Sequence, residues 1–213
     1  ELYMKGAKCG GMIIAAVYNG TVRNCRVLDC ATAQDSAYAP LWIRHSDRIT
    51  VEYCEIAGST NKTDGMAVDF DGWTTNCTYR YIYSHDNTRF MKNCVFDCKT
   101  KNAGNCVYNC VSVNDNKKMN WAAISLVSLS RPSFGRMADF TFRDNWIING
   151  KPIFWLCTEK PQAQNIKFMS TPTGNFFQKL FNLFISPDNF TYVTPEHDVL
   201  EARIGEITAN LSE

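Results

Sequence analysis

The sequence has 213 residues, a formal charge of +1 and 45% hydrophobic residues. The balanced charge gives no basic surface for nucleic acid or an anionic membrane, and no apolar run reaches the roughly 18 residues that a spanning helix needs. Ten cysteines are many for a chain long enough to bury an apolar core without disulfides. We therefore interpret most of them as small, reduced core residues.

Short strands are predicted along most of the chain, in two series that alternate. The first series reads GMIIAAVYN (11–19), APLWIRHSD (39–47), GMAVDFDG (65–72), WAAISLVSL (121–129) and KPIFWLCTE (151–159). The second series lies at 21–30, 50–59, 78–87, 106–115 and 140–149, with a weaker copy, NIKFMS, at 165–170. Around Phe90 to Cys98 the register of the first series is less clear. Polar turns separate the strands and no helical pattern lies between them, which argues against a doubly wound α/β sheet.

The second series repeats with a nearly constant period. One position in it is Cys25, Cys54, Ile82, Cys110 and Asn145, at steps of 29, 28, 28 and 35 residues (54 − 25, 82 − 54, 110 − 82, 145 − 110). A repeat of about 28 residues with two or three strands is typical of a β-solenoid, in which equivalent positions stack in one column. The sequence thus predicts an all-β parallel β-helix of about six coils over residues 1–174, with a cysteine ladder inside.

A different pattern begins near the C-terminus. In NFFQKLFNLF (175–184) the aromatic and leucine residues recur at helical spacing. We expect a short amphipathic helix that, with a tail forming a loop and a short helix, caps the last coil as residues 175–213. The alternative, a membrane or partner contact by the Phe-rich face, stays open.

The stretch DGMAVDFDGWTTNCTYRYIYSHDN (64–87) resembles the repeats of bacterial right-handed parallel β-helix proteins of the pectate-lyase-like superfamily. In those repeats a strand of the form DG-x-x-x-D-x-DG leads to a second strand that ends in YSHDN. The resemblance covers roughly residues 10 to 170, and it implies a single-stranded right-handed β-helix. Its implied functions are diverse, because the superfamily includes lyases, glycoside hydrolases, esterases, epimerases, tailspikes and adhesins.

Strand alternation in GMAVDFDG separates two faces. Met66, Val68 and Phe70 should point inward, so that Asp69 and Asp71 point outward with their Cα atoms roughly 6.5–7 Å apart.

The strand of the preceding coil, APLWIRHSD, extends this outer face. If Ile43 stacks near Val68, Arg44 lies beside Asp69 and Trp42 lies beside Ala67. An aromatic ring, an arginine and paired carboxylates on one face predict a sugar-binding groove.

Two catalytic hypotheses follow. In a glycoside hydrolase, Asp69 and Asp71 would serve as acid and base or nucleophile. In a polysaccharide lyase, Arg44 or Lys92 would abstract a proton, and the Asp pair would hold Ca²⁺. The alternative is that both aspartates are solvated strand residues, with Arg44 and Asp69 forming an ordinary cross-strand ion pair.

The remaining candidate contacts are substrate-binding residues around this face. They are Trp42, His45 at the end of its strand, His85 in the SHDN turn, and Lys92. The x3 spacing of Cys94 and Cys98 is not that of a zinc site, so no metal site is predicted. No phosphate-binding loop or nucleophile elbow occurs, and the Gly-His-Gly signature of polygalacturonase-type hydrolases is also missing.

The sequence therefore predicts a carbohydrate-active protein, a glycoside hydrolase or polysaccharide lyase, that binds a polysaccharide along its outer face. It needs no cofactor, except Ca²⁺ in the lyase case. The alternative is a non-catalytic carbohydrate-binding, adhesin-like or phage-fibre module. We expect a secreted or cell-surface location, with no signal peptide at Glu1 because such signals are removed. The oligomeric state is left undetermined.

Overall fold

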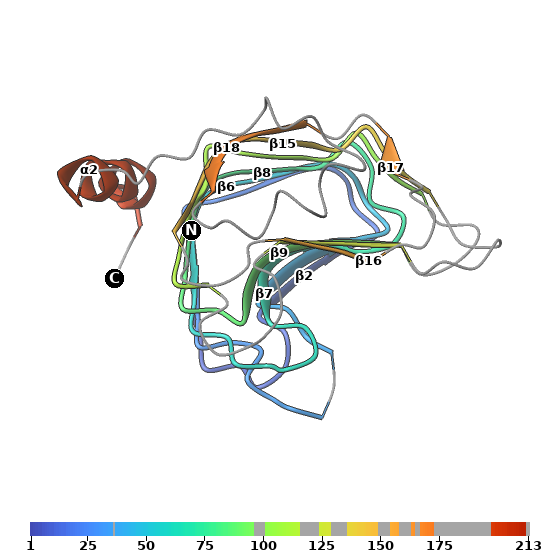
Figure 1. Cartoon of the computed structure of the whole chain (residues 1–213). Coiled ribbons are helices and arrows are strands. Elements are labelled where there is room, and N and C mark those ends of the chain that lie inside the picture. The colour runs from blue at the N-terminus through green and yellow to red at the C-terminus, as the bar shows by residue number, and fades with distance from the viewer. Residues whose placement is uncertain are drawn as a thin grey trace.

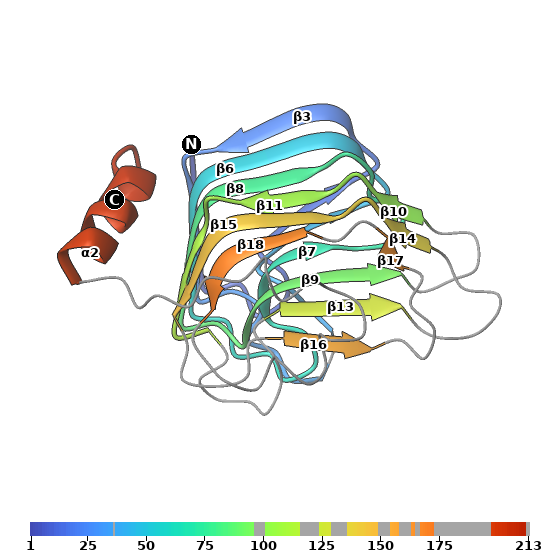
Figure 2. The same ribbon diagram turned by 45° about the horizontal axis from the view of Figure 1, so that its top comes forward.

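The computed structural model describes residues 1–35, 37–95, 101–115, 124–128, 136–148, 154–157, 163–164, 167–172 and 197–211. Over these residues the strands pair in two large parallel sheets and one small sheet. Figure 1 looks along the stack of strands, and Figure 2 turns it so that neighbouring strands lie side by side.

The larger sheet has nine strands. They are β1 (Leu2–Lys5), β3 (Tyr18–Arg23), β4 (Cys25–Leu28), β6 (Asp47–Ala57), β8 (Thr78–His85), β11 (Cys106–Tyr108), β12 (Val111–Val113), β15 (Thr141–Ile148) and β18 (Lys167–Pro172). The strands pair in parallel, each with strands about one repeat away in sequence.

The six-stranded sheet faces it across the core (Figure 1). Its strands are β2 (Met12–Ala15), β5 (Leu41–Arg44), β7 (Met66–Phe70), β9 (Arg89–Val95), β13 (Ile124–Ser128) and β16 (Phe154–Cys157). A small sheet lies at the turn between the two and contains β10 (Lys101–Ala103), β14 (Arg136–Ala138) and β17 (Ala163–Gln164).

Residues with left-handed backbone mark the corners of the larger sheet. One set is Asn24, Tyr53, Tyr81, Asn109 and Asp144, with φ between 51° and 56°. These residues directly precede the column predicted from sequence and therefore recur at its steps of 29, 28, 28 and 35 residues. The predicted pairing of Cys54 with Ile82 is confirmed by the register of β6 and β8.

Buried asparagines connect neighbouring turns through the backbone. Asn145, in the predicted column, accepts a hydrogen bond from the Cys110 N–H at 2.9 Å and donates one to the Val107 carbonyl at 2.9 Å. Asn105 bridges Cys77 and Thr74 in the same way, at 2.9 and 2.8 Å. These side chains satisfy backbone groups that the turns leave unpaired, which is why a polar residue is stable inside the stack.

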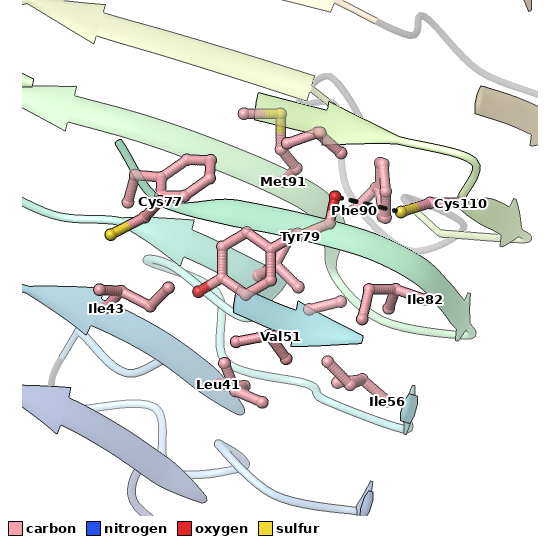
Figure 3. Packing of buried hydrophobic residues seen from close by; sticks show 14 of the residues in the cluster. Leu41, Ile43, Val51, Ile56, Cys77, Tyr79, Ile82, Phe90, Met91 and Cys110 are labelled. Atoms are coloured by element: carbon pink, nitrogen blue, oxygen red, sulfur yellow. Dashed lines mark hydrogen bonds between the residues drawn. The ribbon is translucent and has the colours of Figure 1, made fainter. Parts of the chain in front are cut away.

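The core lies between the two large sheets. Val51, Tyr79, Val107 and Phe142 occupy the same position on successive strands and are fully buried. Figure 3 shows Tyr79 among the aliphatic side chains of both sheets. Its ring packs against Phe70 with centroids 4.7 Å apart, so the two sheets are held together by aromatic contacts. Burial of one such side chain contributes about 1.5–3 kcal/mol.

A helix, α2 (His197–Thr208), lies beside β6 and β8 (Figure 1). Ile207 is buried, and the Arg203 guanidinium lies over Tyr81 and Trp146, 5.9 and 5.7 Å from their ring centroids. The tail thus contains a short helix, as expected. The expectation that it lies over the last coil is wrong, because it packs against β6 and β8 of the larger sheet. The predicted helix at 175–184 lies outside the described residues.

The chain is therefore strand-rich, with parallel sheets in an all-β arrangement that is compatible with a β-helix or solenoid. Within the described ranges, no helix is both long enough and apolar enough to cross a membrane.

Candidate functional site

The predicted site residues gather on the six-stranded sheet, but the register differs from the expected one. Trp42 pairs with Asp69, and Leu41 pairs with Val68. The prediction that Arg44 lies beside Asp69 and Trp42 beside Ala67 is therefore wrong by two residues. Strand alternation could not detect this error, because a shift of two residues leaves every side chain on the same face.

The outer face of this sheet carries a continuous column of side chains. On successive strands it consists of Ile13, Trp42, Asp69, Lys92 and Ser125. Ile13 is 52% exposed, whereas Asp69 is only 1% exposed and Ser125 is fully buried. The interpretation of Asp69 as a solvated strand residue is therefore wrong. The connections 29–40 and 58–65 extend beyond the sheet on this side (Figure 1, blue and cyan).

Lys92 is the charged centre of the column. Its Nζ lies 2.8 Å from Asp64 Oδ1, and both side chains are largely buried. Burial alone would lower the pKa of Lys92, but the nearby charges of Asp69 and Asp64 outweigh it and raise the pKa above its ordinary value. The amine therefore stays protonated, which suits it to neutralise a substrate carboxylate rather than to act as the proton-abstracting base.

Asp69 is the most perturbed acid of this face. Burial raises its pKa well above the usual range, with Asp71 and Asp64 adding to the effect and Lys92 opposing it. Among the described residues its Oδ1 has no hydrogen-bond partner. A raised pKa favours the protonated form of a carboxyl group, which is the form that a general acid needs.

Asp71 lies two residues further along the same face. Burial raises its pKa, while a hydrogen bond from the Gly72 N–H at 3.0 Å and the charges of Lys92 and Arg44 lower it. Arg44 thus acts on Asp71 and not on Asp69 as predicted from the assumed register. The two aspartates differ in environment, which is the condition for different protonation states.

An open groove of about 590 Å³ begins where β5 and β7 end. It runs along the turns that lead into the larger sheet. Its lining consists of Ala16, Val17, Tyr18, His45, Ser46, Asp47, Trp73 and Thr75. His45 follows Arg44 directly, and Trp73 lies two residues after Asp71. The groove therefore begins shortly after Arg44 and Asp71 along the chain, but neither residue, nor Asp69, lines it.

Two aromatic residues dominate the exposed surface of the groove. Tyr18 is 62% exposed and Trp73 is 46% exposed. Trp73 has φ of 64°, a left-handed conformation that disfavours bulky residues. Ala16 and His45, the equivalent residues two repeats and one repeat earlier, have the same left-handed conformation, so this backbone belongs to a repeated corner of the coil. Of the predicted residues only His45 lies in the groove.

Tyr18 and Trp73 were not predicted as site residues. Tyr18 is the first residue of β3, inside the predicted segment 11–19, and Trp73 lies in a turn outside the strand pattern. One signal in the sequence could have indicated Trp73. It directly follows Asp71-Gly72, in a turn where a polar residue is usual, so a tryptophan there is unexpected.

His85 lies on the other sheet, apart from this site. Its ring nitrogens lie 3.1 Å from Glu55 Oε1 and 3.0 Å from Asp86 Oδ2, and the ring stacks on Tyr83 at 4.6 Å. The contacts hold the ring between two carboxylates on the outside of the larger sheet. They give His85 a structural role in the protein and do not bring it to the Asp69 face.

We expect His85 to make stability depend on pH. Burial opposes its protonation, but the bonds to Glu55 and Asp86 prevail and raise its pKa above the ordinary value near 6.5. The stabilisation is complete below pH 6.5 and declines as pH rises through the raised pKa. Thermal unfolding from pH 5.5 to 8.5 should therefore show a decline that His85→Gln flattens. An equal slope in the variant would contradict this assignment.

Among the described residues, no group of three His, Cys, Asp or Glu side chains converges as metal ligands. No protein-family model matches the chain, and no curated protein matches its sequence.

Proposed function

We propose that this protein is a right-handed, single-stranded parallel β-helix of the pectate-lyase-like kind that binds and cleaves a polysaccharide. The observation that carries the proposal is the pair of buried aspartates, Asp69 and Asp71, whose pKa values burial raises. An open groove with exposed aromatic rings begins a few residues further along the same turns of the chain. A perturbed acid beside a groove is the usual signature of a catalytic site.

The groove supplies sugar binding in this proposal. The faces of Trp73 and Tyr18 stack on the C–H groups of pyranose rings, while His45 and Asp47 hydrogen-bond to hydroxyl groups. The next sugar unit then meets Arg44 and Asp71 at the strand ends. Trp42 and Lys92 support this face from neighbouring strands.

The carboxylate environments favour hydrolysis. Asp69, whose pKa burial raises, donates a proton to the leaving oxygen, and Asp71 acts as base or nucleophile. The lyase alternative keeps Arg44 as the base, and the raised pKa of Lys92 makes that residue a poorer choice for the role than the sequence indicated. Only the lyase would recruit Ca²⁺ to offset the uronate charge.

A second candidate function is a non-catalytic glycan-binding module of a secreted or surface-attached protein. It is favoured by the burial of Asp69, which is 1% exposed, beside a groove that is open. In that case the Asp69–Lys92 column only stabilises the sheet.

The test is a polysaccharide panel of pectin, alginate, xylan, arabinan and glycosaminoglycans, with and without Ca²⁺. Reducing ends and the absorbance of unsaturated uronate are followed for the parent protein and for Asp69→Asn/Asp71→Asn. We expect reducing ends without the unsaturated product, and a loss of at least about 100-fold in the double variant. Asp144→Asn, on an exposed carboxylate of the other sheet, is the matched control and should retain full activity.

The outcomes separate the hypotheses. An unsaturated product would assign a lyase. Equal cleavage by the parent protein and the double variant would exclude the Asp pair from catalysis. If the parent protein and both variants bind a polysaccharide and none of them cleaves it, the non-catalytic glycan-binding module is favoured.

A further inference from the structure

Two buried cysteines lie side by side near the first strands of the larger sheet. The register pairs Arg23 with Glu52 and Arg26 with Glu55, which is a constant offset of 29 residues (52 − 23, 55 − 26). Cys25 and Cys54 have the same offset, and they are 4% and 0% exposed. They therefore occupy neighbouring inward positions on adjacent parallel strands, β4 and β6.

Their spacing fits a covalent bond. Adjacent strands lie about 4.8 Å apart, and disulfides join residues whose Cα atoms are roughly 4.4–6.8 Å apart. Each thiol also contacts a backbone carbonyl two residues earlier in the chain, Cys25 that of Arg23 and Cys54 that of Glu52, both at 3.2 Å. The two thiols are thus held in equivalent orientations, beside each other.

We propose that Cys25 and Cys54 form a thiol pair that oxidises reversibly to a disulfide between neighbouring strands. The co-reactant is a low-molecular-weight disulfide such as oxidised glutathione. This inference is independent of the proposed function, because both thiols lie inside the stack and not in the groove or on the Asp69 face.

The chemistry proceeds by two exchange steps. The Cys25 thiolate attacks one sulfur of the small disulfide, forms a mixed disulfide and releases one small thiolate. The Cys54 sulfur, after losing its proton, then attacks the Cys25 sulfur, closes the intramolecular bond and releases the second small thiolate. The protein loses two protons and two electrons, and one small disulfide becomes two small thiols.

The surroundings of Cys25 and Cys54 differ, and the difference assigns each cysteine its step in the exchange. Cys25 is the residue nearer the edge of the sheet. Among the described residues β1 alone covers Cys25 on its outer side, with Leu2 as the paired residue and 42% exposed, so Cys25 meets the small disulfide first. Fraying of this edge strand admits the small disulfide. A hydrogen bond from Cys54 also lowers the pKa of the Cys25 thiol, which favours its thiolate, and the same contact and burial raise the pKa of Cys54.

The experiment incubates the native protein with oxidised glutathione, alkylates free thiols under denaturing conditions and maps tryptic peptides by mass spectrometry. We expect residues 24–26 to be linked to residues 49–62, with a mass loss of about 2 Da that dithiothreitol reverses. In Cys54→Ala, Cys25 should instead stop at a stable glutathione adduct. This variant distinguishes the two exchange steps.

Cys110→Ala is the matched control, because Cys110 is buried in the same column but its neighbour on β8 is Ile82. This variant should form the 24–26 to 49–62 link as readily as the parent protein. A different linked pair, or two alkylated cysteines at positions 25 and 54 after oxidation of the folded protein, would overturn the proposal. Circular dichroism of each variant verifies that the compared proteins are folded.

Discussion

Lys92→Met is expected to lower the free energy of unfolding by about 3–5 kcal/mol, the usual cost of removing one partner of a buried ion pair. Methionine fills a similar volume, so the loss is electrostatic. It leaves Asp64, which lies 2.8 Å from the Lys92 amine, without its cation in a buried site. Urea denaturation at pH 7 measures the change, with an unaltered dependence on denaturant as the sign that the folded state is otherwise intact.

Lys5→Met serves as the control for this prediction. Lys5 lies 3.9 Å from Asp29, but both side chains are 58% exposed, so water replaces the lost contact. We expect a change within about 0.5 kcal/mol. Similar effects of the two substitutions would show that the Asp64–Lys92 pair is solvated and does not stabilise the fold.

Trp73→Asn is expected to weaken glycan binding roughly 10- to 30-fold, the effect of losing a central aromatic contact. The same substitution should raise the melting temperature by about 2–4 °C. Asparagine tolerates the left-handed backbone at φ 64°, and the ring it removes is half exposed, so little burial is lost. Affinity electrophoresis in polysaccharide gels and differential scanning calorimetry measure the two effects.

Opposite signs for binding and stability distinguish a binding residue from a structural one. Trp73→Phe keeps an aromatic face and the strained backbone, so it should retain most of the affinity and the parent melting temperature. A Trp73→Asn protein that melts lower and binds normally would assign the indole to packing, and the groove would lose its role in the proposal.

Much of the strand pattern was predictable from sequence, because each coil must repeat the same alternation to bury its apolar face. The inward positions of Val68 and Phe70 and the pairing of Cys54 with Ile82 follow from it. The relative shift of β5 and β7 does not, since Trp42 and Arg44 both face outward and either fits beside Asp69 by alternation alone. Turn lengths decide that shift.

The groove and the burial of Asp69 were not predictable for a related reason. Both depend on how turns fold over strands, and turns carry no periodic signal. Trp73 shows the difficulty directly: it occupies a position where small polar residues are usual, so its sequence context indicated a turn without indicating a ring exposed beside His45.

The left-handed corner residues also indicate where the chain accommodates inserted residues. Asn109 and Asp144 are 35 residues apart, whereas Tyr81 and Asn109 are 28 apart (144 − 109, 109 − 81). All three residues nevertheless have the same left-handed backbone conformation. The added residues fall between Asn114 and Asp139, which are 25 residues apart, whereas the equivalent Asp86 and Gly104 are 18 apart (139 − 114, 104 − 86). Insertions placed between Asn114 and Asp139 offer a route to new specificities by laboratory evolution while the stacking of the larger sheet stays in register.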